Sequence, residues 1–327
     1  MRTWKPHAAF GRWIALLVLI VALGGVIVLA NELLRAVLQP PEQWPIDADL
    51  YLRILGLLGL LVLSGMATYR FAGALSMRYA VDRNAVYVTW LGNRVVIPLA
   101  QIELIERGVT GKNALQFVMR SFGYYHGQMR LDDGRTLHLL TPISPARSLV
   151  IYTASDAYAI APDDADAFMA DLEQRRRLGA IQQLTPAFDS GRLFLYAFWG
   201  DPVVKATLIA AIGLNLLLLG FLMVRYPGLE PLVEMRFTAA GDVAELRPRH
   251  QVLFTPMAAS VILLLNAGLG LMLYKREQVG ARMLQFGSLL VQVLFSIAAL
   301  SIITGMKYRK KAGRLLVSQA NAFYLGS

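Results

Sequence analysis

The sequence predicts an α-helical membrane protein with five transmembrane helices and an α+β domain inserted between the second helix and the third. The chain of 327 residues is 56% hydrophobic and only 17% charged, which is too apolar for an ordinary soluble domain. It holds five apolar runs of about the length that crosses a bilayer, roughly 20 residues. The segment 77–180 differs from these runs because strand and turn signals alternate along it.

We divide the chain into three regions. Residues 1–76 hold a pair of transmembrane helices, and residues 77–180 form the inserted domain. Residues 181–327 hold three further helices, an extramembrane loop at 225–251 and a basic tail. The chain has no cysteine, which excludes disulfides, thiolate metal sites and a cysteine nucleophile.

The first apolar run covers residues 13–30 and follows three basic residues. A secretory signal peptide is the alternative interpretation. However, this run is longer than the usual apolar core of a signal peptide, and no small-residue cleavage site precedes Asn31. We therefore expect a retained membrane helix here, and a second one over residues 52–74.

The inserted domain begins with short runs of β-branched and aromatic residues. Asp132, Asp133 and Gly134 form a hairpin-type turn between two such runs, because Asp and Gly tolerate the positive φ that these turns need. The pattern predicts a strongly bent antiparallel sheet, or a barrel. The expected strands lie between residues 77 and 102 and over 113–122, 128–131, 135–140, 149–152 and 157–160.

A helix is predicted to follow the sheet, over residues 163–178. Pro162 and three acidic residues mark its start, three arginines occupy its last turn, and Gly179 ends it. Phe168 and Leu172 recur at helical spacing within it. We expect both side chains to face the sheet, so that the helix covers one open end.

Several stretches of the inserted domain are similar to those of a known family. They are Tyr-Ala-Val-Asp at 79–82, Val-x-Val at 86–88, Val-Val-Ile-Pro-Leu-Ala-Gln-Ile at 95–102, Ile-Tyr-Thr at 151–153, Asp-Ala-Tyr-Ala-Ile-Ala-Pro at 156–162, and Phe168. They resemble the small bacterial pleckstrin-homology (PH-like) domains of membrane proteins. The resemblance extends to residues 265–277 and 291–292 in the later helices. It implies a fold and an architecture, because these are packing and turn residues, and it implies no reaction.

The charge is unevenly distributed along the chain, whose formal net charge is +10. Residues 78–200 hold 13 basic and 12 acidic residues, and the remainder holds 19 basic and 10 acidic residues. The positive excess therefore lies on the helical regions and their flanks, where it can meet anionic lipid head groups. A nearly neutral folded domain argues against a nucleic-acid partner.

An uncharged amide lies near the middle of each of the last three apolar runs, which cover residues 203–224, 252–273 and 283–304. The amides are Asn215, Asn266 and Gln292, and in hydrocarbon each needs a hydrogen-bond partner. One interpretation is a polar path for a small solute. The other is a set of interhelical contacts, worth about 1 kcal/mol each. No ionisable residue lies at that depth, which favours the contacts. Because a short connector joins their helices, Asn266 and Gln292 are expected to meet.

We find no pattern of catalytic, metal-binding or cofactor-binding residues. The four histidines lie in four different regions without metal-ligand spacing, and no nucleotide-binding or hydrolase fingerprint occurs. The sequence therefore predicts neither an enzyme nor a cofactor. Five arginines are candidates for contact with lipid head groups, although ordinary solvated arginines explain them as well. They are Arg83, Arg94, Arg175, Arg176 and Arg177.

Five membrane crossings would place the two termini on opposite sides of the membrane. The connector 39–50 holds three acidic residues and no basic one, so we expect it outside and the PH-like domain in the cytoplasm. The basic tail after residue 304 argues for the opposite orientation. We expect a non-catalytic protein of the bacterial plasma membrane whose PH-like domain is an interaction or scaffolding module for a protein partner. The alternative is a subunit of a small-molecule transporter with a polar path near the three amides.

Overall fold

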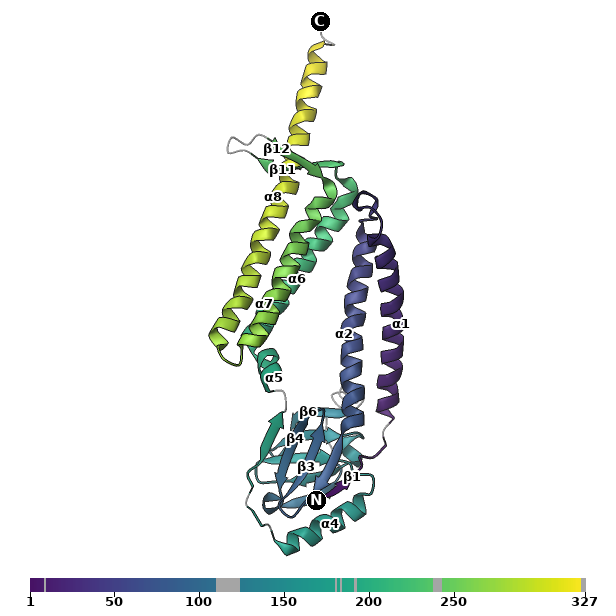
Figure 1. The fold of residues 1–327 in the computed structure, drawn as a ribbon, viewed down its shortest axis with the longest axis vertical. Helices are drawn as coiled ribbons and strands as arrows, with labels where there is room; N and C mark the ends of the chain where they lie inside the picture. The colour runs from purple at the N-terminus through teal and green to yellow at the C-terminus, as the bar shows by residue number, and fades with distance from the viewer. Residues whose placement is uncertain are drawn as a thin grey trace. The chain divides into compact units, whose positions relative to one another are not determined.

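A computed structural model describes residues 1–8, 10–109, 124–179, 181–182, 184–190, 193–237 and 243–324. The chain forms two compact units. The domain unit comprises residues 1–28 and 57–192, and the bundle unit comprises residues 29–56 and 193–327. Figure 1 shows their elements. The α-helices are α1 Gly11–Val37, α2 Ala48–Ser76, α4 Ala165–Leu178, α5 Leu193–Gly200, α6 Pro202–Arg225, α7 Phe254–Leu273 and α8 Gln278–Tyr324.

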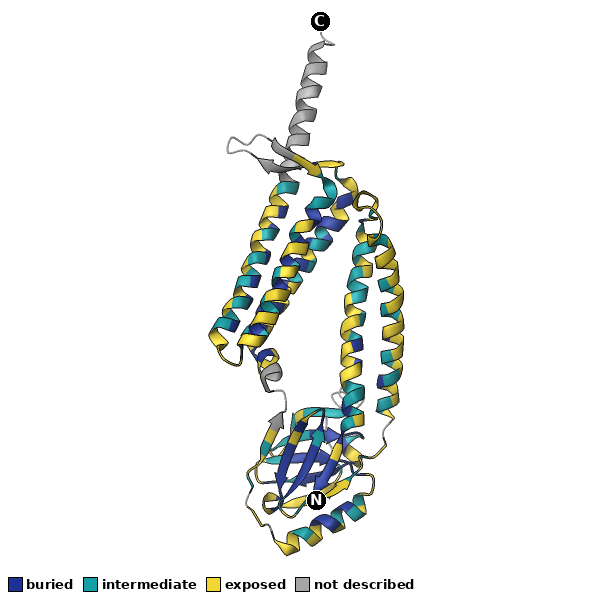
Figure 2. Cartoon of the chain, in the orientation of Figure 1, coloured by how far each residue is buried: buried dark blue, intermediate teal, exposed yellow. Residues whose placement is uncertain are grey.

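The predicted apolar helices are confirmed as helices. Among the described residues, five are long and apolar enough to cross a membrane: Gly11–Val37, Ala48–Ser76, Pro202–Gly228, Arg249–Leu273 and Gln278–Ile303. Many of their apolar side chains are exposed (Figure 2), and Leu17 on α1 and Val62 on α2 are 62% and 73% exposed. Such a surface suits a lipid environment rather than water.

The first sheet of the domain unit has the strand order β1-β2-β3-β4-β10, and all its pairs are antiparallel. The strands are β1 Arg2–Trp4, β2 Arg78–Val81, β3 Ala85–Trp90, β4 Asn93–Pro98 and β10 Ala187–Ser190. The backbone of β3 turns into β4 at Leu91 and Gly92, which both have positive φ. The inner side chains of this sheet, Val86, Val88, Trp90 and Ile97 among them, belong to the main hydrophobic core.

The second sheet has the strand order β5-β8-β9-β7-β6. Its strands are β5 Leu104–Arg107, β6 Tyr125–Arg130, β7 Thr136–Thr141, β8 Leu149–Tyr152 and β9 Asp156–Ile160. The expected turn at Gly134 joins β6 to β7, and Gly134 has a φ of +87°. The expected strand at 113–122 lies outside the described residues.

The expectation of one strongly bent antiparallel sheet is corrected in two respects. The described strands form two separate five-stranded sheets in this unit and do not close into a barrel. In addition, β9 forms a hairpin with β8 but is parallel to its other neighbour, β7. Local residue patterns indicate where a strand lies, whereas its partner and direction depend on residues far away in the sequence.

The strand β1 was not predicted. It precedes the first apolar helix, yet it pairs with β2, which follows the second one. Trp4 then packs against the core, with its ring 5.6 Å from that of Phe168 in an edge-to-face contact. Cleavage after the first apolar run would remove this edge strand, so the packing supports a retained helix over a signal peptide.

The helix α4 covers the domain core as the sequence predicts. Asp164 caps its start by accepting a hydrogen bond from the Ala167 backbone N–H at 2.9 Å, and Gly179 ends it with a φ of +75°. Phe168 and Leu172 are completely buried in the main core, which confirms that they face the sheets.

The bundle unit contains α6, α7 and α8, which pack against each other. Asp201 caps α6 through the backbone N–H groups of Val203 and Val204, and its carboxylate also accepts hydrogen bonds from Tyr274 and Arg282 at 2.8 Å. Although burial raises the pKa of Asp201, these hydrogen bonds together lower it below its ordinary value. The carboxylate therefore links the ends of three helices. A hairpin of β11 Leu232–Phe237 and β12 Val243–Pro248 joins α6 to α7.

Candidate functional site

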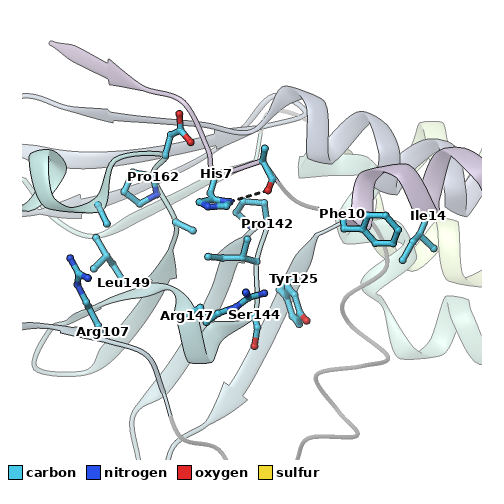
Figure 3. A pocket seen from close by; sticks show the side chains of 16 residues that line it. His7, Phe10, Ile14, Arg107, Tyr125, Pro142, Ser144, Arg147, Leu149 and Pro162 are labelled. Carbon is cyan, nitrogen blue, oxygen red and sulfur yellow. Dashed lines mark hydrogen bonds between the residues drawn. The ribbon is translucent and has the colours of Figure 1, made fainter.

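The domain unit contains a pocket of about 560 Å³ beside the start of α1 (Figure 3). Its walls come from the segment between β1 and α1, the first turns of α1, the ends of β5 and β7, and the start of α4. The lining residues are His7, Ala8, Phe10, Gly11, Ile14, Arg107, Tyr125, Pro142, Ile143, Ser144, Arg147, Leu149, Ala161, Pro162, Asp163 and Ala165.

The segment after β1 forms one wall because its backbone is bonded to the end of the second sheet. The His7 N–H donates to the Ala161 carbonyl at 2.8 Å, and the Asp163 N–H donates to the Lys5 carbonyl at 2.9 Å. His7 Nδ1 also lies 2.9 Å from the carbonyl oxygen of Ala8. The two backbone hydrogen bonds hold residues 5–7 against the end of the second sheet.

The opposite wall depends on a close approach at Gly108. This residue has a φ of +78°, and a Cβ placed on it would lie 2.4 Å from the carbonyl oxygen of Ala146. The Gly108 N–H donates to Ser148 O at 2.8 Å, and the Val109 N–H donates to Pro145 O at 3.2 Å. These bonds join the end of β5 to the 3₁₀ turn Pro145–Arg147. They bring Arg107 and Arg147 to the same pocket.

The pocket has a small positive charge. Arg147 is exposed, and among the described residues it has no ion pair. Arg107 pairs with the exposed carboxylate of Asp166, and Asp163 is the acidic residue of the lining. Phe10 and Ile14 contribute an apolar side from α1 (Figure 3). The pocket thus combines cationic groups, hydroxyl groups and an apolar wall, a combination typical of a ligand site.

Replacing Gly108 with Ala is expected to lower the free energy of unfolding of the domain unit by about 2 kcal/mol. An L side chain with positive φ costs about 1–2 kcal/mol, and the new Cβ must also displace the backbone at Ala146. Hydrogen exchange of β5 and β8 in the full chain measures the loss.

Gly134→Ala is the matched control, since Gly134 also has positive φ but open space around its Cβ position. This variant should lose only about 1 kcal/mol, the cost of the backbone conformation. Equal losses in the two variants would show that the approach of Gly108 to Ala146 is unimportant.

The structure disperses the five arginines proposed for lipid contact. Arg83 is exposed in the turn between β2 and β3, and the Arg94 guanidinium stacks 4.2 Å from the centre of the Tyr87 ring. On α4, Arg175 pairs with Asp171 at 3.1 Å, Arg176 donates to the Ile102 carbonyl at 2.9 Å, and Arg177 pairs with Glu173 at 3.2 Å. None of the five lines the pocket.

The three interior amides lie in two groups of hydrogen bonds within the bundle unit. Asn215 Nδ2 donates to Gln292 Oε1 at 2.9 Å and to the Pro256 carbonyl at 3.0 Å. Ser260 donates to Asn215 Oδ1 at 2.9 Å, and Gln292 Nε2 donates to the Ala259 carbonyl at 2.8 Å. This first group connects α6, α7 and α8. Its members form hydrogen bonds with one another and with the backbone of neighbouring helices, which is typical of polar residues that stabilise helix packing.

Asn266 belongs to the second group and does not pair with Gln292 as expected. Its Nδ2 donates to Ser288 Oγ at 3.0 Å, and the backbone carbonyl of Asn266 accepts from Gln285 Nε2 at 2.9 Å. The helix faces agree, but depth was misjudged: α8 begins at Gln278 rather than at the expected residue 283, so Gln292 lies farther from the connector than Asn266 does. Ser288 and Gln292 are one helical turn apart, so each amide meets the residue at its own level.

Double-mutant cycles are expected to show that the two groups of hydrogen bonds contribute independently to stability. Asn215→Leu and Gln292→Leu should each lower the free energy of unfolding by about 1 kcal/mol, and the double variant should lose less than the sum, because both remove the same bond. The losses of Asn266→Leu and Gln292→Leu should add. Unfolding in mixed micelles measures both cycles. Additive losses in the first cycle would contradict the pairing.

Sequence patterns gave no indication of the pocket. His7, Arg107 and Arg147 are far apart in the chain and occur in no recognised motif. They come together only because β1 joins the first sheet and because Gly108 permits the close approach to the 3₁₀ turn. The strand β5 that carries Arg107 was not among the expected strands, and the dipeptide Arg107-Gly108 that ends it is compatible with many turns.

One antiparallel and one mixed sheet with a C-terminal helix, joined to helices apolar enough to span a membrane, are consistent with a membrane-associated protein that carries a PH-like domain. Residues 77–176 match the family model described as "Bacterial PH domain", so the chain carries a domain of that family. No curated protein and no solved structure matches the chain. Both β1 and β10 lie outside the matched segment, and both extend its first sheet.

Proposed function

We propose that this chain is a non-catalytic integral protein of the bacterial plasma membrane whose PH-like domain is a membrane-proximal interaction or scaffolding module. One observation carries the proposal: the domain is tied to two candidate spans at the same place. The helix α2 ends at Ser76 and β2 begins at Arg78, while β1 ends at Trp4 and α1 begins at Gly11. Connections this short keep the domain next to the surface from which the helices emerge.

The distribution of charge supports a cytoplasmic domain. The connector between α1 and α2 carries Glu42 and Asp47 and no basic residue, and nearby Arg53 is paired with Glu32 and Asp49. Arg12 and Arg70 lie at the domain end of the two helices. A single cysteine at exposed Arg83 should resist an impermeant thiol reagent in intact cells, and one at exposed Glu42 should react. The native chain has no cysteine to interfere. The reverse labelling would place the domain outside.

Photo-crosslinking in living cells tests the interaction module. A photoreactive amino acid replaces Arg83 or Arg94, which are exposed on the turn and the strands of the first sheet, or Glu42 in the connector as the control. We expect one protein to be captured from the domain positions and not from the connector. Capture of no protein from either domain position, or of the same protein from the connector, would refute the module.

A further inference from the structure

The pocket beside α1 has an apolar side and a cationic side, which complement the acyl chain and the phosphate of a lipid. Phe10 and Ile14, on the first turns of α1, form its apolar side and are 77% and 41% exposed. Arg107 and Arg147 lie on the walls formed by the domain. A membrane lipid presents a charged phosphate and then an acyl chain in the same order, from the surface toward the hydrocarbon. The apolar run of α1 begins at this pocket, so both parts of a lipid can reach it.

The charge of the lining fits a single negative charge. Among the arginine and acidic residues of the lining, Arg107 and Arg147 give two positive charges and Asp163 gives one negative charge. Arg107 also has a carboxylate partner, Asp166, outside the lining. Arg147 is therefore the cation that remains for an anion, and a guanidinium matches two phosphate oxygens in geometry. The Tyr125 and Ser144 side chains add hydroxyl groups to the same lining.

We propose that this pocket binds the phosphodiester head group of an anionic membrane lipid, with Arg147 as the main phosphate contact and Phe10 and Ile14 against the acyl chain. The inference rests on the proposed function, since it requires the domain to lie at the membrane surface. It differs from the interaction module, because the pocket faces α1 whereas Arg83 and Arg94 lie on the first sheet.

Binding to the full chain in a non-ionic detergent tests the proposal by calorimetry. The probes are dihexanoyl phosphatidylglycerol, dihexanoyl phosphatidylcholine, glycerophosphoglycerol without acyl chains, and inorganic phosphate. We expect the short-chain anionic lipid to bind at least about tenfold more tightly than each other probe, because each of them lacks the net charge or the acyl chain.

Arg147→Gln should weaken binding of the anionic lipid by about tenfold, since it removes one charge-assisted contact. Arg130→Gln, at an exposed arginine of the same domain outside the pocket, should leave binding unchanged. Equal binding of the two lipids, an equal loss in both variants, or binding of inorganic phosphate as tight as that of the lipid would overturn the proposal. Crosslinking from Arg83 should persist in the Arg147→Gln variant, so failure of the lipid site and failure of the interaction module remain distinguishable.

Discussion

Replacing Phe168 with Ala should lower the free energy of unfolding of the domain unit by about 3–5 kcal/mol. The Phe168 side chain is completely buried between α4 and the sheets, and its ring contacts Trp4 of β1. Its removal leaves a cavity in the main core and loosens the N-terminal strand together with the helix. Hydrogen exchange of β1, β3 and β8 in the full chain reports the loss for each element.

Leu178→Ala provides the comparison within the same helix. Leu178 is 59% exposed at the end of α4, so this variant should stay within about 0.5 kcal/mol of the unaltered chain. If β1 of the Phe168→Ala variant retains full protection from hydrogen exchange, then the packing of Trp4 does not depend on its contact with Phe168. Equal effects of the two variants would mean that α4 does not cover the core.

Acidification from pH 6.5 to pH 4 is expected to destabilise the domain unit by about 3 kcal/mol through His126, in addition to the general effect of acid. Burial, and then the positive charge of Arg70, lower the pKa of His126 from 6.5 to about 4. The ring lies between Trp90 and Tyr124, at centroid distances of 5.3 and 5.7 Å. Within the described part of the chain, its Nδ1 has no hydrogen-bond partner.

Acid destabilises the folded domain because its His126 binds a proton less readily than His126 of the unfolded chain. Below pH 6.5 the unfolded chain binds a proton at His126 that the folded domain does not bind, so the unfolded state gains stability as the pH falls. This loss of folding stability is complete only near the folded pKa of about 4. His126→Gln should remove this part of the pH dependence, and His7→Gln, at an exposed histidine, should retain it. The difference between the variants in hydrogen exchange at pH 7 and pH 4.5 measures it, and equal slopes would contradict a buried neutral His126.

Local signals predicted the elements of this fold better than their partners. The five apolar helices follow from length and composition, and α4 follows from its acidic start, its arginine-rich end and the spacing of Phe168 and Leu172. Strand partners depend on residues far apart in sequence. Hence the parallel pairing of β7 with β9 and the pairing of β1 with β2 were missed. Three residues such as Arg2–Trp4 contain too little periodicity to indicate a strand.

The same limit applies to the sites. Asn215, Asn266 and Gln292 were conspicuous because an amide in an apolar run is costly without a partner, and this cost is a property of the local sequence. The identity of each partner depends on how deep each residue lies along its helix, and hence on where the helix begins, which the apolar pattern placed five residues too late for α8. The pocket arginines lie in ordinary polar sequence, so only the packing at Gly108 distinguishes them from other arginines.

The pairing of β1 with β2 also constrains the order of events during synthesis. Residues 2–4 are synthesised before their partners at 79–81, and both α1 and α2 are made in between. The strand β1 therefore has no partner in its sheet until β2 has been made. With two membrane crossings, as proposed above, β1 and the PH domain lie on the same side of the membrane in either orientation.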